Sequence, residues 1–186
     1  MSGERFKPRS LEEMNPAERR VAESIMAGPR KVLRGPFSAL LYSPEMGDRA
    51  QKLGEQVRFH NSLPAPLKEL AILAVARHWT AQYEWYAHRR LALEAGLDAA
   101  IIDAIAQGKR PGKLTPEEAA VYTFASELLA TKEVSDATFA GMQQRFGEQG
   151  VVDLICTMGY YSLVSMTLNA NRYPLPEGAE PLQKLG

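Results

Sequence analysis

The sequence predicts an all-α domain of about seven to eight helices, and three observations lead to this prediction. Apolar residues recur at three- and four-residue spacing along most of the chain, which is typical of amphipathic helices. The alternating pattern of a half-buried strand does not occur, and no glycine-rich phosphate loop follows a strand. The periodic stretches are separated by capping residues, glycine and proline, which mark where helices begin and end.

The chain of 186 residues is expected to form one domain over residues 15–178, which is long enough to bury a core. Residues 1–14 are charged and lack the apolar stretch of a secretion signal, so we expect a flexible N-terminal arm. Residues 179–186 are expected to form a C-terminal tail. No internal repeat or low-complexity linker divides the domain.

Charge and cysteine content exclude some classes of function. The 22 basic and 22 acidic residues balance, so nucleic acid is not an expected partner. The one cysteine, Cys156, cannot form an intramolecular disulfide and gives no sign of an oxidising compartment, so we expect a cytoplasmic protein. Because Cys156 lies in an apolar stretch, we interpret it as a buried small hydrophobe rather than a reactive thiol.

Residues 151–168 form the most apolar stretch and carry one charge, Asp153. The stretch also contains threonines, serines and a glycine, which suit a buried or oligomer-forming helix better than a membrane span. We therefore expect no membrane partner.

The first third of the chain predicts two helices. Asn15 followed by Pro16 is a cap with proline at the first helical position, which predicts a helix to about Met26. A second helix is expected from Ser43 to about Phe59. Its apolar stripe consists of Met46, Ala50, Leu53 and Val57.

Between these helices, the segment 30–37 carries Arg30, Lys31 and Arg34. Charged segments usually face water, so an ordinary solvated connector is one interpretation. The other is a clamp for a substrate carboxylate, because a guanidinium group can bind a carboxylate with two parallel hydrogen bonds. We take Arg34 as the substrate-binding candidate.

Two central helices are predicted over residues 64–78 and 80–96. In the first, leucines and alanine recur at helical spacing, while Lys68, Arg77 and His78 mark a more polar side. Thr80 is expected to cap the second helix, and Gly96 is expected to end it.

These two helices contain three side chains that could perform acid–base chemistry. Glu84 and His88 are four residues apart and share one helix face. If the two helices pack as a hairpin, Glu69 faces that pair across the seam. Such a pair on a helix is more often a solvated neighbour pair, so the acid–base site is a hypothesis.

Four further helices are expected in the second half. Asp98 begins a short helix that Gly108 closes, and Thr115 begins the next with a cap, a proline and a glutamate at the third helical position. Ser135 caps a helix that ends at residues 146–147, and the last helix runs from about 149 to 170.

The central stretch resembles the carboxymuconolactone decarboxylase family and its alkylhydroperoxidase D (AhpD) branch. That family carries a glutamate on one helix and C-x-x-C-x-x-x-H on the next. In this chain the glutamate is Glu69, the two cysteine positions are Ala81 and Glu84, and the histidine is His88. Tyr83 stands where the peroxidase branch has a histidine between the cysteines. The resemblance covers about residues 20–178 and implies an AhpD-like helical fold.

Both peroxidase cysteines are missing. A thiol peroxidase needs a thiolate that attacks the peroxide and a second thiol that resolves the product. Alanine and glutamate can do neither, so AhpD-type peroxidase activity is the disfavoured alternative.

The resemblance implies a lyase without cofactor, similar to 4-carboxymuconolactone decarboxylase, that acts on a small carboxylated lactone or aromatic-derived acid. Glu69, Glu84 and His88 are then the catalytic candidates, and Tyr83 and Arg34 the substrate-binding ones. In this hypothesis a neutral glutamic acid donates to the substrate, His88 acts as the base and Glu69 fixes its tautomer; which carboxylate is the acid stays open.

Two further alternatives remain. Two carboxylates and an imidazole also suit a divalent metal, although the resemblance implies neither metal nor organic cofactor. A non-catalytic binding or assembly protein is the remaining interpretation. In each case the resemblance implies a homo-oligomer, either a trimer or a hexamer.

Overall fold

A computed structural model describes residues 3–185 and confirms the all-α fold, with eight helices and no strand in that range. The count agrees with the predicted seven to eight. The helices are α1 (Pro16–Ala27), α2 (Phe37–Leu40), α3 (Pro44–Phe59), α4 (Ala65–His78), α5 (Gln82–Glu94), α6 (Ala99–Ala106), α7 (Pro116–Thr131) and α8 (Asp136–Asn171).

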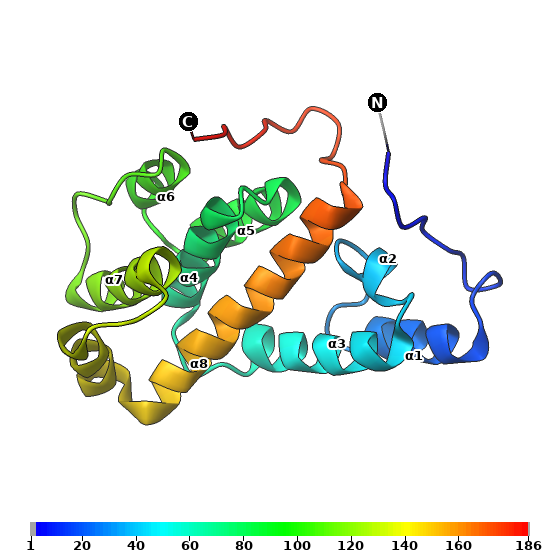
Figure 1. The fold of residues 1–186 in the computed structure, drawn as a ribbon, viewed down its shortest axis with the longest axis horizontal. Coiled ribbons are helices and arrows are strands. Elements are labelled where there is room, and N and C mark those ends of the chain that lie inside the picture. The colour runs from blue at the N-terminus through cyan, green and yellow to red at the C-terminus, as the bar shows by residue number, and fades with distance from the viewer. Residues whose placement is uncertain (1–2, 186) are drawn as a thin grey trace.

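Helix α4 is the centre of the domain, and α5, α6, α7 and α8 all pack on it (Figure 1). Ten of its fourteen residues are buried, so the polar side that the sequence suggested is largely absent. Lys68 and His78 lie nearer the surface, but Arg77 is buried with an exposure of 6%. A helix buried on nearly every side has no wide solvent face, which explains why periodicity alone could not orient it.

Helix α8 crosses the front of the domain in Figure 1 and is bent near its first third. Gly147 has a φ of 65° and interrupts the helical backbone, as the predicted break at residues 146–147 required. By length and composition α8 could span a membrane, with a mean hydropathy of 1.4, but half of its most apolar window is buried inside the domain. It packs on α3, α4, α5 and α7, as a core helix does.

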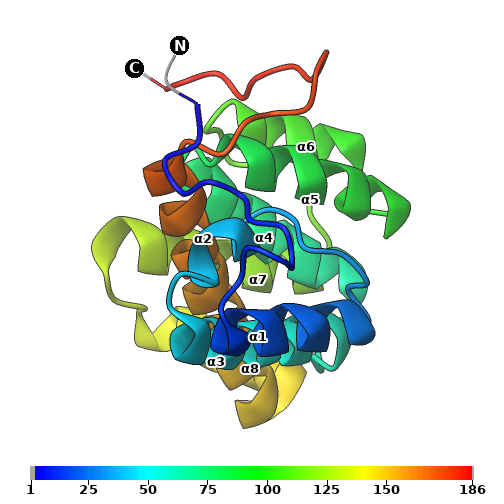
Figure 2. The ribbon, with the colours of Figure 1, turned by 90° about the vertical axis from the view of Figure 1, so that its right-hand side faces the viewer.

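Helices α1, α2 and α3 form a smaller group, in which α1 and α3 lie at the end of the molecule opposite the C-terminal tail and α2 lies between them and the tail (Figure 2). Val21, Ala22 and Ile25 of α1 pack with Phe37 and Leu41 in a second apolar cluster. The segment expected to be a flexible arm contacts this group and α8 at several points. The backbone amides of Arg5 and Phe6 both donate to Asn171, and the Tyr42 hydroxyl donates to the carbonyl of Lys7.

The inward face of α3 differs from the predicted stripe. Met46 and Leu53 are exposed, while Gly47, Gln51 and Gly54 are buried beside Val57. The reason is close packing: a Cβ on Gly47 would lie 2.8 Å from the Leu40 carbonyl oxygen, and one on Gly54 would lie 2.1 Å from the Tyr160 hydroxyl. The two glycines bring α3 against its neighbours, so its buried face is set by small residues and not by large apolar ones.

The predicted starts of α1 and α7 are confirmed as capping boxes on Asn15 and Thr115. Thr80, in contrast, does not cap α5. It adopts a left-handed backbone with a φ of 47°, and Ala81 occupies the cap position. Its hydroxyl accepts a hydrogen bond from Arg77 instead.

The C-terminal tail runs back over α5 and α6 (Figure 1). The Gln82 side chain and the Leu182 backbone exchange two hydrogen bonds of 2.9 and 2.8 Å. Arg77 donates to the carbonyls of Gln183 at 2.6 Å and Ala106 at 3.1 Å, and Leu182 joins the main core. The tail thus closes the outer side of the helices that carry the candidate site.

Candidate active site

The three acid–base candidates meet in the seam between α4 and α5. The Nδ1 of His88 lies 2.6 Å from Oε2 of Glu69, and its Nε2 lies 2.9 Å from Oε1 of Glu84. Both ring nitrogens therefore bond to carboxylate oxygens. The result is a continuous row of carboxylate, imidazole and carboxylate.

Local sequence explains this arrangement. The link between α4 and α5 is short, and the Ala81 amide bonds back to the Ala76 carbonyl, so the two helices return on each other as a hairpin. The spacing of four residues then stacks Glu84 and His88 on the α5 face that meets Glu69 on α4.

The triad is removed from water: Glu69, Glu84 and His88 are 6%, 5% and 3% exposed. Burial lowers the pKa of His88, but the charge on Glu84 and hydrogen bonds from Glu69 and Glu84 outweigh it and raise the pKa to about 9. At neutral pH the imidazole is therefore protonated and donates to both glutamates.

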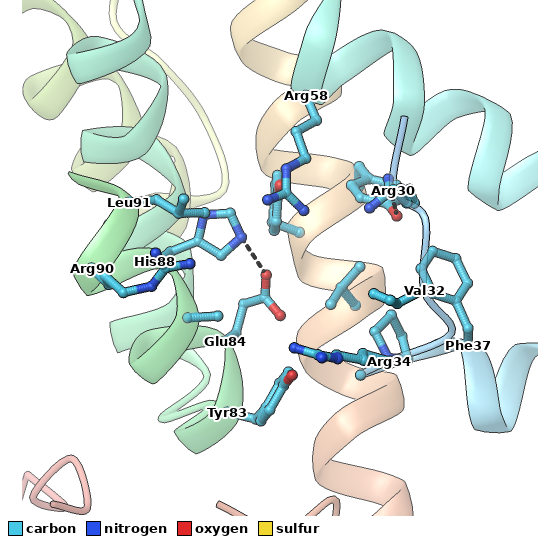
Figure 3. Close-up of a pocket in the computed structure, with 16 residues that line it drawn as sticks. Arg30, Val32, Arg34, Phe37, Arg58, Tyr83, Glu84, His88, Arg90 and Leu91 are labelled. Carbon is cyan, nitrogen blue, oxygen red and sulfur yellow. Dashed lines mark hydrogen bonds and ion pairs between the residues drawn. The ribbon is translucent and has the colours of Figure 1, made fainter. Parts of the chain in front are cut away.

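One end of the triad opens into a cavity of about 220 Å³. Figure 3 shows the Glu84 carboxylate pointing into the space between α5 and the connector that carries Arg34, with Arg58 reaching in from α3. Glu69 does not line this cavity, whereas Glu84 and His88 do. Both ring nitrogens of His88 are already bonded, so Glu84 is the member of the triad whose polar group is directed at a bound molecule.

Arginines dominate the cavity wall. Arg30 and Arg34 come from the connector, Arg58 from α3 and Arg90 from α5. Arg90 pairs with Glu94 at 2.6 Å. Within residues 3–185, no carboxylate lies at ion-pair distance from Arg30, Arg34 or Arg58. A wall with three unpaired guanidinium groups favours an anionic ligand.

The connector is thus not only a solvated link, because Arg30 and Arg34 line the cavity while Lys31 does not. Tyr83 lies at the same cavity, where its ring packs edge-on against Tyr173 at 4.6 Å. Gly35 leaves room for the Tyr83 ring in this position, since a Cβ at residue 35 would lie 3.2 Å from the ring. Burial and the neighbouring Tyr173 raise the pKa of Tyr83.

The cavity residues that sequence reasoning missed include Arg58, Tyr160 and Tyr161. Arg58 lies in the last turn of α3, and the two tyrosines belong to the apolar stretch that we interpreted as a buried or oligomer-forming helix. No local pattern marks them, because they join the site through the packing of α3 on α8 and of α8 on α5.

No group of three or more histidine, cysteine or acidic side chains in residues 3–185 is arranged to hold a metal ion. In the triad, both histidine nitrogens are already bonded to carboxylates. Cys156 is half-buried against the main core on α8 and does not line the cavity of Glu84.

Comparison with known proteins supports the resemblance. Residues 44–127, which contain all three members of the triad, match the model of the carboxymuconolactone decarboxylase family. The predicted relation to this family is therefore confirmed over this stretch.

The fold is also that of a solved AhpD-like core. The chain is similar to an uncharacterised peroxidase-related protein from Ralstonia eutropha JMP134, described as an alkylhydroperoxidase AhpD core, with a TM-score of 0.75. The alignment covers 95% of this chain and 94% of that one at 14% identity, so it establishes the shared fold. No match was found among curated proteins.

Proposed function

We propose that the protein is a cofactor-independent lyase that decarboxylates a small carboxylated lactone or aromatic-derived acid. The observation that carries this proposal is the joining of a buried acid–base triad to a cavity with unpaired arginines. An acid–base group and a guanidinium wall in one cavity suit a carboxylated substrate that must receive a proton.

The geometry favours Glu84 as the group that transfers the proton to the substrate. His88 has no free ring nitrogen, because Glu69 and Glu84 occupy both. The sequence-based hypothesis made His88 the base, and we now propose that it stores the proton behind Glu84. Glu69 keeps its expected role of holding the imidazole, through the bond to Nδ1.

The proposed reaction balances as follows. The bond between the substrate carbon and its carboxylate breaks, carbon dioxide leaves, and the electron pair stays on the substrate as an enolate. Glu84, protonated by the His88 imidazolium, delivers that proton to carbon and returns to a carboxylate. His88 then regains a proton from solvent, so the net reaction consumes one proton and releases one carbon dioxide.

Arg34 and Tyr83 are the proposed substrate contacts. Figure 3 shows the Arg34 guanidinium directed toward Glu84 and Tyr83, so a carboxylate bound there would lie beside the reacting group. Arg30 and Arg58 supply further positive charge on the far wall.

The test is carbon dioxide release from γ-carboxymuconolactone by the wild type and by Glu84→Gln. We expect release by the wild type and a loss of about a thousandfold in the variant, because correctly placed acid–base groups contribute roughly 10²- to 10⁴-fold. Equal rates would remove Glu84 from the chemistry. Peroxide turnover driven by a dithiol, without decarboxylation, would favour the AhpD-type alternative, and ligand binding without turnover would favour a binding protein.

We also propose that the protein is a cytoplasmic homo-oligomer, a trimer or a hexamer, which assembles through α8. One face of this helix carries exposed apolar side chains at a spacing of three or four residues around Gly159. Light scattering should give a mass that is three or six times the 20.6 kDa of the chain. Substitution of a charged residue on this face should lower the measured mass. A monomeric wild type would contradict the proposal. The exposed residues are Val152, Ile155, Leu163 and Met166.

A further inference from the structure

Tyr161 on α8 lies against the triad. Its ring meets the His88 ring edge-on, with a centroid distance of 4.8 Å and an interplanar angle of 79°. The side chain is nearly enclosed, with an exposure of 3%, and it lines the same cavity as Glu84. The phenol is therefore beside the reacting groups and not part of a remote core.

The Tyr161 hydroxyl has no hydrogen-bond partner among residues 3–185. Fully enclosed polar atoms without a partner in this range are Arg30 Nε, Arg77 Nε and Ser165 Oγ, and the Tyr161 oxygen is not one of them. Since the residue is otherwise buried, its oxygen opens to the cavity. A buried hydroxyl that meets only a ligand cavity is the usual arrangement of a group that bonds the ligand.

The adjacent Tyr160 gives an internal contrast. It is equally enclosed and its ring packs edge-on against Tyr161 at 5.2 Å, but its hydroxyl contacts Arg30 at 3.4 Å. The absence of a side chain at Gly54 makes room for that hydroxyl. The Tyr160 oxygen thus accepts a hydrogen bond from the protein, while no hydrogen bond from the described residues occupies the Tyr161 hydroxyl.

We propose that Tyr161 is a further catalytic residue, whose hydroxyl donates a hydrogen bond to the substrate oxygen that becomes negative as carbon dioxide leaves. The inference rests on the proposed lyase function. When the bond to the carboxylate breaks, the electron pair moves onto a carbonyl oxygen of the substrate, and a fixed donor stabilises that oxyanion. No proton needs to leave Tyr161, because Glu84 supplies the proton that reaches carbon.

The surroundings keep Tyr161 in the form that can donate. Burial, together with the charges of Glu84 and Glu69, raises its pKa well above the ordinary tyrosine value. The hydroxyl therefore keeps its hydrogen at every pH at which the protein would work, and its ring fixes the oxygen through contacts with His88 and Tyr160.

The first test is the substitution Tyr161→Phe, which keeps both ring contacts and removes only the hydroxyl. We expect kcat for decarboxylation to fall roughly 100-fold, with KM changed less than about threefold, because the bond forms only as the oxyanion develops. The matched control is Tyr122→Phe, which removes a hydroxyl that bonds the Lys109 carbonyl on another face and should leave both constants unchanged.

A second test does not depend on turnover. The probe 4-hydroxy-3-nitrobenzoate carries a carboxylate for the arginines and a phenol whose ionised form absorbs visible light. A donor directed at the phenol oxygen stabilises the phenolate form of the probe. The ionisation constant of the bound phenol should therefore be about tenfold lower in Tyr161→Phe than in the wild type, which is the change expected for one hydrogen bond to a charged group. Tyr122→Phe should match the wild type.

The two tests separate the failure of this inference from the failure of the proposed function. Loss of phenolate in Tyr161→Phe without any decarboxylation by the wild type would reject the reaction but keep the oxyanion donor. Decarboxylation that is unaffected by Tyr161→Phe, or an unchanged phenolate fraction, would overturn the donor role. A wild type that does not bind the probe would overturn both proposals for this cavity.

Discussion

Helix α4 carries two buried charged side chains, Glu69 and Arg77, and both are 6% exposed. They lie on the same helix but have opposite kinds of surroundings. Glu69 bonds the imidazolium of His88, which in turn bonds Glu84 at the cavity. Arg77 bonds only neutral groups, namely the carbonyls of Ala106 and Gln183 and the Thr80 hydroxyl.

This difference separates a buried charge that belongs to a candidate active site from one that only stabilises the fold. At Glu69 the buried charge is coupled to a second charge and then to a space that a ligand can enter, so its energy can change during a reaction. At Arg77 the charge is distributed over fixed dipoles that hold the tail, and the pocket beside it contains His78 but no carboxylate. Burial of a charge alone does not identify a catalytic residue, but its chain of partners does.

Of the two buried charges on α4, Glu69 should give the larger effect, through the change Glu69→Gln. The amide can still accept the bond from Nδ1, but its lost charge weakens the imidazolium, so we expect decarboxylation to fall roughly 100-fold, or about 3 kcal/mol in transition-state stabilisation. Steady-state kinetics against pH should also show the upper limb moving to lower pH. The exposed Glu148→Gln serves as the matched control, and equal loss in both variants would contradict the role of Glu69.

The second prediction concerns stability against pH. The pKa of His88 is about 9 in the folded protein and about 6.5 in an unfolded chain. Because the folded value is the higher one, this stabilisation is complete below pH 6.5 and is lost as the pH rises through 9. It amounts to roughly 3 kcal/mol at most.

Urea denaturation of the wild type and of His88→Gln between pH 6 and 10 measures this effect. The difference in the free energy of unfolding between the two proteins should shrink as the pH rises. A constant difference would show that the imidazole is not charged within the triad.

Much of the fold was predictable, because caps and apolar spacing are local signals. Asn15 and Thr115 marked two helix starts correctly, and the motif of Glu69, Glu84 and His88 was visible as a spacing. The inward face of α3 was predicted wrongly, since Gly47 and Gly54 are buried by close approach and not by hydrophobicity.

The rest of the site was not predictable from the sequence, because it depends on how distant elements pack. Arg58 reaches the cavity only because α3 lies against α8, and Tyr161 only because α8 lies against α5. Arg77 looked like a solvent-facing residue on a polar side, and its burial depends on a tail more than a hundred residues away, with a separation of 106 to Gln183.

The third prediction sharpens the contrast at the other end of α4. Arg77→Met should lower the free energy of unfolding by about 2 kcal/mol, because two carbonyls lose a charged donor, while kcat and KM stay near the wild-type values. Urea titration with parallel kinetics checks both parts. Arg145→Met, at an exposed position, is the comparison; a catalytic defect in Arg77→Met that exceeds its loss of stability would show that the tail acts on the site.

The smallest expected effect is at the rim of the cavity. Arg34→Gln should raise KM about tenfold, or about 1.4 kcal/mol, with little change in kcat, because a carboxylate contact of this kind binds substrate and transition state alike. Arg34→Lys keeps the charge but not the forked geometry, so its KM should fall between those of the wild type and Arg34→Gln. Lys31 is close in sequence to Arg34 but does not line the cavity, so the kinetic constants of Lys31→Gln give the reference. An equal change in KM there would show that Arg34 acts only through its positive charge and not through contact with the substrate.

The lack of a side chain at Gly54 on α3 helps to determine the shape of the cavity, because Tyr160 and Arg30 of the cavity wall occupy the space beside it. Any side chain at this position would compete with the Tyr160 hydroxyl for the same space, since even a methyl carbon would lie 2.1 Å from that oxygen. Tyr160 would have to turn away, and Arg30, whose Nη2 would lie 2.6 Å from the same carbon, would move with it. Substrate range in relatives of this protein, natural or engineered, is therefore open to selection at a residue that never touches the substrate.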